Sequence, residues 1–247
     1  MKEENIEDLR IHGHMVLSGG KYKTVKIHGR AVFQSDLISE VTKVHGETKI
    51  EGNIKSKIAK IFGSIDIKGD SDFKTIKVYG FCHSSLNINS DEIKVHGDLR
   101  SDGNVNCEII DAYGKIKAKG NFNADKFYCI GEVKIEKELN ADVLTIYNKG
   151  NSKVNLIGGS IINLKKFLPG GFHKIIHKLL LLDKWKRKLF YVDVIEGDEI
   201  YIEYTKAKVV RGKSITIGEC CEVDYIEYYD VLNKNGKSII KKELKIK

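Results

Sequence analysis

The chain has 247 residues, a formal net charge of +8 and a single proline, which suits one elongated domain rich in strands. Residues 1–5 contain no apolar stretch, so we expect no signal peptide, and the longest purely apolar run, residues 179–182, is far too short to cross a bilayer. The five scattered cysteines lack the spacing of a zinc site, which favours the reducing cytoplasm as the compartment.

Residues 1–10 are polar and charged, and we expect them to form an N-terminal cap or tail. A unit made of an apolar residue, a histidine or aromatic residue and a glycine then recurs, beginning with Ile11-His12-Gly13. Its last position recurs at equal steps after a slightly shorter first step: Gly13, Gly29, Gly46, Gly63, Gly80, Gly97, Gly114, Gly131 and Asn148. Because asparagine is the commonest non-glycine residue with positive φ, this column predicts a left-handed backbone at one corner of each repeat.

Between these corners, apolar residues alternate with polar residues in three short runs per unit. Alternation places one set of side chains inward on each strand. Three strands per unit in constant register predict an all-β fold, a parallel β-helix of triangular cross-section with about 17 residues per coil. We expect residues 11–164 to form these coils, with Cys82, Cys107 and Cys129 on inward columns as small core residues.

The segment 165–190 does not fit the repeat, because Pro169-Gly170-Gly171 interrupts it and a helix-like amphipathic stretch follows. Residues 165–188 carry eight basic residues against one acidic residue. We expect a short helical insertion that either lies on an anionic membrane surface or a partner, or packs over the rod. The candidate contact residues are Phe167, Leu168, Lys174, Lys178, Trp185, Lys186, Arg187 and Lys188.

The repeat resumes over residues 191–232, where Val209-Val210-Arg211-Gly212 resembles the corner unit and places Gly212 in the glycine column. Residues 233–247 carry six lysines against one glutamate and are expected to form a basic C-terminal tail, with a closing strand as the alternative. The rest of the chain is mildly acidic, so the positive charge is concentrated in the insertion and at the C-terminal end.

The repeat, with its Val/Ile-His/Tyr-Gly corner, resembles that of the bactofilins, the polymer-forming cytoskeletal proteins of bacteria. The resemblance covers residues 11–164 and 191–230, and residues 195–212 are similar to the C-terminal part of a larger bactofilin-like subgroup. It implies a right-handed β-helix that assembles end to end into nucleotide-free filaments, sits at the inner membrane surface and recruits cell-wall enzymes. The chain departs from that pattern in its length and in the interruption at 165–190.

Two sets of histidines are candidate metal ligands. His12, His28 and His45 either bind a metal or stack ring on ring beside the turn, where no second ligand type recurs. His173 and His177 have the i, i+4 spacing of two ligands on a helix, without a third. The sequence shows no nucleophile–histidine–acid set and no phosphate-binding loop. A column of carboxylates is expected to be a solvated corner rather than an acid–base pair: Asp91, Glu108, Asp125 and Asp142.

These features favour a non-enzymatic scaffold that needs no metal or cofactor and self-assembles through the edges of its terminal coils. Its expected partners are further copies of itself and an anionic membrane surface or cell-envelope proteins, at the inner face of the membrane. Nucleic acid is not expected, because no aromatic stacking platform accompanies the basic segment. A monomeric or oligomeric binding or signalling module is the alternative. A carbohydrate-modifying β-helix enzyme fits less well, because it requires a different coil length or a groove of carboxylates.

Overall fold

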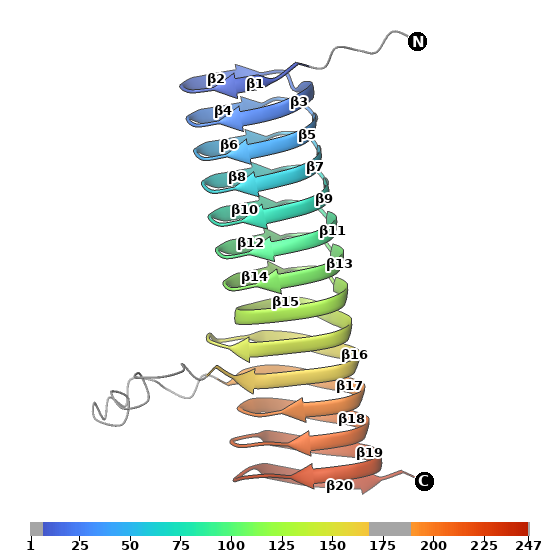
Figure 1. Cartoon of the computed structure of the whole chain (residues 1–247). Helices are drawn as coiled ribbons and strands as arrows, with labels where there is room; N and C mark the ends of the chain where they lie inside the picture. The colour runs from blue at the N-terminus through green and yellow to red at the C-terminus, as the bar shows by residue number, and fades with distance from the viewer. Residues whose placement is uncertain (1–6, 168–188, 247) are drawn as a thin grey trace, which may run out of the picture.

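The protein is a right-handed parallel β-helix of about 13 turns, which confirms the fold class expected from the repeat (Figure 1). The computed structural model describes residues 7–167 and 189–246. Neighbouring strands of a β-sheet lie about 4.8 Å apart, so a stack of about 13 coils is about 60 Å long. The expected helical insertion falls almost entirely on residues 168–188, which lie outside the described residues.

Each coil consists of strands joined by tight bends. In the first seven coils, strands of about four residues alternate with strands of eight, whereas in the later coils the strands run on around the bends. The strands are β1 (Leu9–Ile11), β2 (His14–Leu17), β3 (Gly20–Ile27), β4 (Arg30–Phe33), β5 (Leu37–Val44), β6 (Glu47–Ile50), β7 (Ile54–Ile61), β8 (Ser64–Ile67), β9 (Ser71–Val78), β10 (Phe81–Ser84), β11 (Ile88–Val95), β12 (Asp98–Ser101), β13 (Val105–Ala112), β14 (Lys115–Ala118), β15 (Phe122–Asn148), β16 (Lys153–Lys166), β17 (Phe190–Ile202), β18 (Thr205–Ile217), β19 (Glu222–Lys234) and β20 (Ile239–Lys245).

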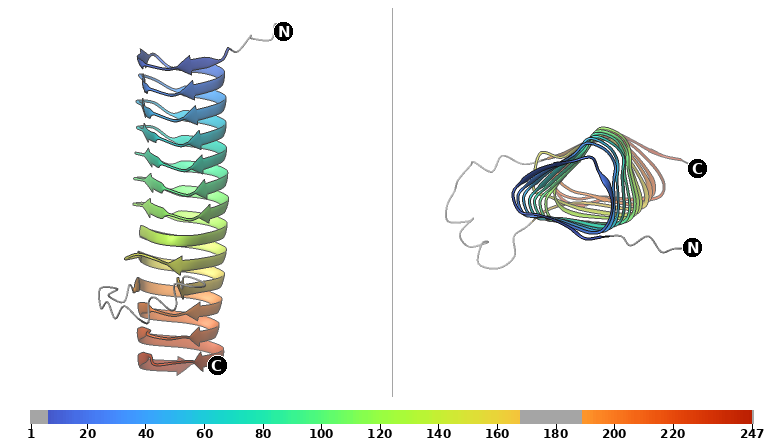
Figure 2. Two further views of the ribbon diagram at one scale, coloured as in Figure 1. Left: turned by 60° about the vertical axis from the view of Figure 1, so that its left-hand side comes forward. Right: turned by 90° about the horizontal axis from the view of Figure 1, so that it is seen from above.

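Equal coil length places each residue directly next to its counterpart one coil earlier. Val44 of β5 pairs with Ile61 of β7, which pairs with Val78 of β9, and all these pairings are parallel. Seen along the axis, the coils superimpose as a triangle (Figure 2). The positions that recur once per coil therefore become straight columns of side chains along the rod.

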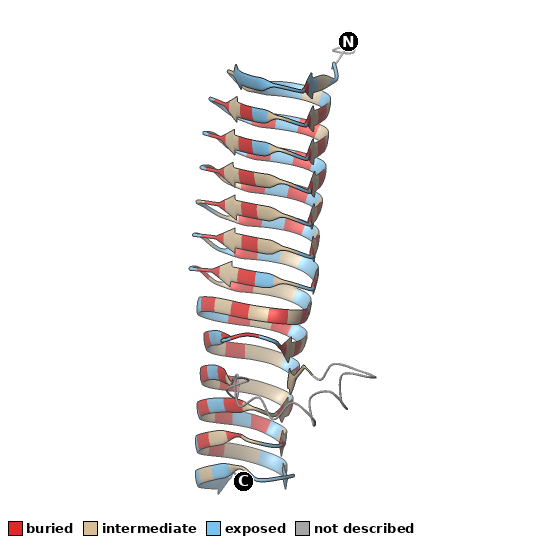
Figure 3. Cartoon of the chain, turned by 90° about the vertical axis from the view of Figure 1, so that its left-hand side faces the viewer, coloured by how far each residue is buried: buried red, intermediate tan, exposed pale blue. Residues whose placement is uncertain are grey.

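One continuous apolar core fills the rod from end to end. Buried and more exposed positions alternate along the strands (Figure 3), so that Ile27, Val44 and Ile61 are fully buried while the residue before each of them in the sequence faces outward. Burying an isoleucine side chain stabilises the fold by about 2 kcal/mol. Because each coil contributes such residues and cannot cover them alone, stability comes from stacking on the neighbouring coils.

The rod includes more of the chain than the sequence indicated at both ends of the insertion. β16 continues through Lys166, and Phe190 begins β17 with its ring buried in the core. Residues 233–247, expected as a basic tail, instead supply the end of β19 and the whole of β20, which pairs with β19 in parallel. The closing strand, the alternative for this segment, is therefore what the structure contains.

The corner glycines are required for a different reason from the expected one. None of them has positive φ, and neither has Asn148, so the predicted left-handed backbone is wrong for this column. A β-carbon on Gly46 would overlap the carbonyl oxygen of Gly29 in the preceding coil, and the same close approach recurs from Gly29 to Gly131. The column therefore excludes side chains because adjacent coils approach too closely there, not because of the backbone conformation.

Gly212 does not belong to that column. It pairs with Gly197, which pairs with Gly159, and a β-carbon on Gly159 would overlap the carbonyl oxygen of Ala141. These residues continue a different column, at the bend inside the long strands. The insertion interrupts the count and the step from β17 to β18 is 15 residues, so the phase read from the tripeptide pattern no longer identifies the corner.

Candidate functional site

Aromatic and histidine rings form a ladder along one corner of the rod, which extends the stacking expected as one alternative for His12, His28 and His45. From His12 to Tyr113 the consecutive ring centroids are 4.7–5.4 Å apart and the planes differ by at most 11°. The residue before Gly131 is Ile130, which has no ring. Tyr128 supplies the ring of this coil instead and makes tilted contacts to Tyr113 and Tyr147. Because the rings cover one another's faces, the ladder presents ring edges to solvent.

The histidines of this ladder stack rather than converge on a metal ion. His28 lies between His12 and His45 with nearly parallel rings. Partial desolvation and the neighbouring His45, His12 and Lys26 lower the pKa of His28. Among residues 7–167 and 189–246, no group of three His, Cys, Asp or Glu side chains could hold a metal ion. His173 and His177 lie outside the described residues.

His83 lies between two carboxylates on an outward face of the rod. Its Nδ1 is 2.6 Å from Oδ1 of Asp66 one coil earlier, and its Nε2 is 3.6 Å from Oδ2 of Asp102 one coil later. Burial opposes ionisation of Asp66, yet hydrogen bonds from Lys68 and His83 outweigh it and lower the pKa of Asp66. The cluster was not apparent from the sequence, because its members belong to three consecutive coils and only the coil register brings them together.

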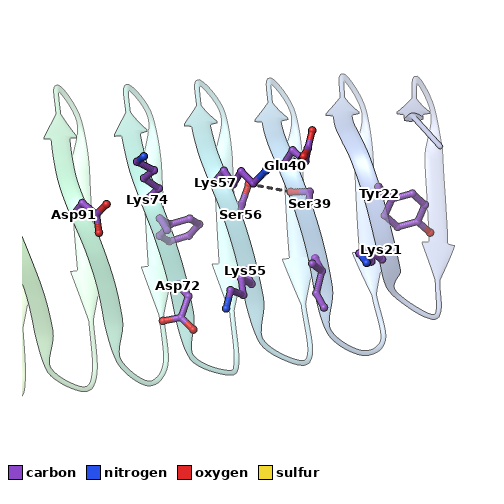
Figure 4. Close-up of a pocket in the computed structure, with 12 residues that line it drawn as sticks. Lys21, Tyr22, Ser39, Glu40, Lys55, Ser56, Lys57, Asp72, Lys74 and Asp91 are labelled. Atoms are coloured by element: carbon purple, nitrogen blue, oxygen red, sulfur yellow. Dashed lines mark hydrogen bonds and ion pairs between the residues drawn. The ribbon is translucent and has the colours of Figure 1, made fainter. Parts of the chain in front are cut away.

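An open groove of about 490 Å³ runs along the rod across β3 to β11 (Figure 4). Its floor is one column, in which two small serines lie between Tyr22 and Phe73. The hydroxyl of Ser39 donates to Ser56 at 2.9 Å, and Glu40 and Lys57 pair at 2.8 Å on one rim. No histidine lines this groove; the acidic side chains in its lining are Glu40, Asp72 and Asp91.

Two ladders of asparagine and aspartate side chains also depend on the register, and sequence reasoning missed them. On one face, each amide of Asn106 and Asn123 donates to the asparagine of the preceding coil at 2.9–3.0 Å. At a bend, the side-chain oxygens of Asp36 and Asn53 accept the backbone N–H groups of the following coil at 2.7–2.8 Å. In the sequence, each ladder is visible only as a polar residue that recurs once per repeat. The ladder at the bend stabilises the stack of coils by satisfying backbone donors.

The buried cysteines are core residues rather than nucleophiles. Burial raises the pKa of Cys82, Cys107 and Cys129 to about 12. A thiol with such a pKa stays protonated at neutral pH and is a poor nucleophile or metal ligand. The inward positions expected from the repeat are therefore confirmed for Cys82 and Cys129, which are fully buried, whereas Cys107 is half-buried.

Of the residues expected to contact a membrane or partner, Phe167 alone lies in the described part of the chain. Its ring packs beneath the ammonium group of Lys149, with 3.9 Å from Nζ to the ring centroid. The other candidates, Leu168, Lys174, Lys178, Trp185, Lys186, Arg187 and Lys188, lie outside the described residues.

The N-terminal end of the rod leaves its core open within the described residues. β2 pairs with β4 alone, and Met15 stands directly beside Ala31 in the inward column. Ala31 is fully buried, but Met15 is 42% exposed and its neighbour Val16 is 55% exposed. An inward apolar residue and a free strand edge are therefore both accessible at this end.

The C-terminal end has charged residues in two of its inward columns. β20 pairs with β19 alone, and Ile239 is 63% exposed. Lys234 continues the inward column of Ile217, and Glu243 continues that of Ile226. The two side chains pair at 2.5 Å and lie over the apolar column ends. The two ends of the rod thus differ in chemistry.

Comparison with known proteins shows a partial likeness. The chain is similar to the uncharacterized protein YhbF of Bacillus subtilis (strain 168), with 37% identity over 95 residues, which is 38% of this chain and 35% of that protein. It is also similar to the uncharacterized protein YhbE of the same strain, with 40% identity over 50 residues, or 20% of this chain and 21% of that protein. The chain thus matches about a third or less of the length of these relatives. No family model and no solved structure matches it.

The described residues include no helix of the length and apolar character needed to cross a bilayer.

Proposed function

We propose that this protein is a structural scaffold of the bactofilin type, which self-associates through the ends of its β-helix and uses the N-terminal coil as the principal contact. The observation that carries the proposal is the exposure of Met15, whose column is otherwise buried and, apart from Thr48, apolar in the coils that follow. Covering this end with a second copy of the chain would remove apolar surface from water.

The strand edges supply the second part of the contact. Among the described strands, β2 and β20 each have one paired side and one side free. Unpaired N–H and C=O groups of an edge strand pair readily with another chain, and such pairing requires no cofactor. Contact between the two different ends would be heterologous and would extend into a filament, whereas contact between two N-terminal ends would stop at a dimer.

The polar C-terminal pair favours the N-terminal end as the stronger surface. Stacking a coil on the C-terminal end would bury Lys234 and Glu243, and desolvating an ion pair costs free energy that its Coulomb attraction does not always repay. Assembly through this end is therefore expected to be weaker.

The experiment is light scattering and electron microscopy of the purified chain over a range of protein concentrations. The variant Met15→Lys places a charge on the N-terminal surface, and Ile240→Lys is its counterpart at the C-terminal end. We expect Met15→Lys to abolish association with an unchanged melting temperature, and Ile240→Lys to affect filaments only. A wild-type chain that is monomeric at every concentration, or assemblies unaffected by both variants, would contradict the proposal.

The basic segment 165–190 is proposed as a second contact, to an anionic membrane surface, on the strength of its composition. Sedimentation with vesicles of phosphatidylglycerol, with and without residues 168–188, tests this separately from assembly. Equal binding by both forms would count against the role of the segment.

A further inference from the structure

A row of lysines runs straight along one face of the rod, one residue per coil. Lys26, Lys43, Lys60, Lys77 and Lys94 are direct register partners in consecutive coils. Each is half-buried, so its aliphatic stem is held against the sheet surface. The backbone positions that carry neighbouring lysines of the row are therefore about 4.8 Å apart.

This row lacks the compensation that several other basic residues of the rod have. Lys57 pairs with Glu40 across one coil step, Arg30 pairs with Glu47, and Lys206 pairs with Glu222. Within the row, Lys94 pairs with Glu92 at 2.6 Å, but the other four lysines form no ion pair with any acid in residues 7–167 and 189–246. Like charges directly opposite one another in a sheet are destabilising, so the fold retains a row that costs stability.

The flanking columns make the row a narrow, one-residue-wide strip. On one side lies the ring ladder, whose outward edges carry the positive part of the aromatic quadrupole. On the other side lie Val41, Ile58 and Thr75, which carry no charge, and the column then reaches Glu92 beside Lys94. The ring faces are covered by neighbouring rings, so the bases of a single-stranded nucleic acid have no free face on which to stack.

We propose that the lysine row binds an acidic polysaccharide that lies extended along the rod axis. A straight, regularly spaced line of cations complements an extended chain that carries an anionic group on each unit. The wall of ring edges adds donors and positive edges for the same groups. The proposal is independent of self-association, because the row lies on the side of the rod and the assembly surfaces lie at its ends.

The probe is fluorescently labelled polygalacturonate, with neutral dextran, phosphatidylglycerol vesicles and single-stranded DNA as competitors. The full chain is expected to bind polygalacturonate, to bind longer oligomers more tightly until they span about five coils, and to lose affinity as salt is added. Dextran should not compete. Tighter binding of vesicles or DNA than of polygalacturonate would overturn the proposal and assign the row to those partners.

The test variant is Lys43→Gln/Lys60→Gln/Lys77→Gln, which keeps the stems and removes three charges. The matched control is Lys55→Gln/Lys74→Gln/Lys117→Gln, which removes three lysine charges on other faces, none of them in an ion pair with a described residue. We expect the row variant to lose affinity by about tenfold or more and to have a shallower salt dependence, while the control changes by less than about twofold. Relief of like-charge repulsion should also raise the melting temperature of the row variant. Equal losses in the two variants would show that net charge alone drives binding and would overturn the proposal.

Discussion

A β-carbon at Gly46 would occupy the space of the carbonyl oxygen of Gly29, one coil earlier. The change Gly46→Ala is therefore expected to force the two coils apart and to destabilise the fold by about 3 kcal/mol or more. Gly13 is the matched control, because nothing lies within 4 Å of its β-carbon position. Gly13→Ala should leave the melting temperature unchanged, as measured by circular dichroism on the Met15→Lys background, which we expect to be monomeric. Equal destabilisation by both changes would point to backbone conformation instead of coil contact.

Replacing an inward isoleucine and an outward isoleucine by lysine should have unequal effects on the stability of the fold. Ile93 is fully buried, whereas Ile109, whose partner in the preceding coil is Glu92, is 43% exposed. Ile93→Lys buries a charge without a partner and should destabilise the fold by more than about 4 kcal/mol. Ile109→Lys should change the melting temperature little. Chemical denaturation followed by circular dichroism measures both, and an unchanged midpoint for Ile93→Lys would disprove the inward position.

The stacked histidines predict a pH dependence of stability. The folded state lowers the pKa of His28, so the unfolded chain binds a proton more readily than the folded chain does. Stability is then complete above the unfolded pKa near 6.5 and declines as the pH falls through the folded value. His28→Tyr keeps a stacked ring and should reduce this decline. The control is His96→Tyr, which lies between two tyrosines. Thermal melts from pH 8 to pH 5 are the measurement, and the hypothesis fails if both variants behave alike.

Asp66 predicts a separate effect at lower pH. Burial opposes its ionisation, but Lys68 and His83 lower its pKa below the usual value, so its contribution is fully present above about pH 4 and is lost as the pH falls through the folded pKa. Asp66→Asn should therefore destabilise the chain at pH 7 and have a smaller effect at pH 3. Denaturant titrations at the two pH values test this, and an equal effect at both would exclude a charge-dependent role.

The polar pair at the C-terminal end predicts a gain of assembly. Replacing it by Lys234→Ile/Glu243→Ile continues the apolar columns of Ile217 and Ile226 to the end of the rod. Both ends would then present apolar surface, and we expect heterologous contacts that lengthen the assemblies into filaments. Electron microscopy should show longer particles than wild type. No change in length would mean that the pair does not limit growth.

The sequence predicted the columns well because a column needs only a constant step. Ile27, Val44 and Ile61 could be assigned to the core from spacing and alternation alone, and the ring ladder followed from the same count. The cause of the glycine column could not be assigned in that way. A conformational requirement and a close approach between coils select the same residue, and only the position of the neighbouring carbonyl distinguishes them.

The assignments that failed or were missed involve relations between columns or changes of phase. Gly212 was placed in the wrong column because the insertion interrupts the count and the step from β17 to β18 is 15 residues. The contact of His83 with Asp66 requires knowing which residue of the next coil lies beside it. The lysine row was visible in the sequence as a residue type that recurs once per repeat. It lies two residues before the ring position and carries no motif, so its meaning depends on which of its lysines pair with an acid in space, and Lys94 alone among the five forms an ion pair with a described residue.

Because the repeated coils have a constant length, the length of the rod can change only in steps of one coil. Removing residues 64–80 would delete one complete coil and place Phe81 directly beside Glu47, with the remaining inward, ring and lysine residues still in their columns. Removing one residue fewer would shift all later side chains out of phase and turn core residues toward water. The reach of this protein is thus counted in whole coils, and it can change during evolution by gain or loss of complete units.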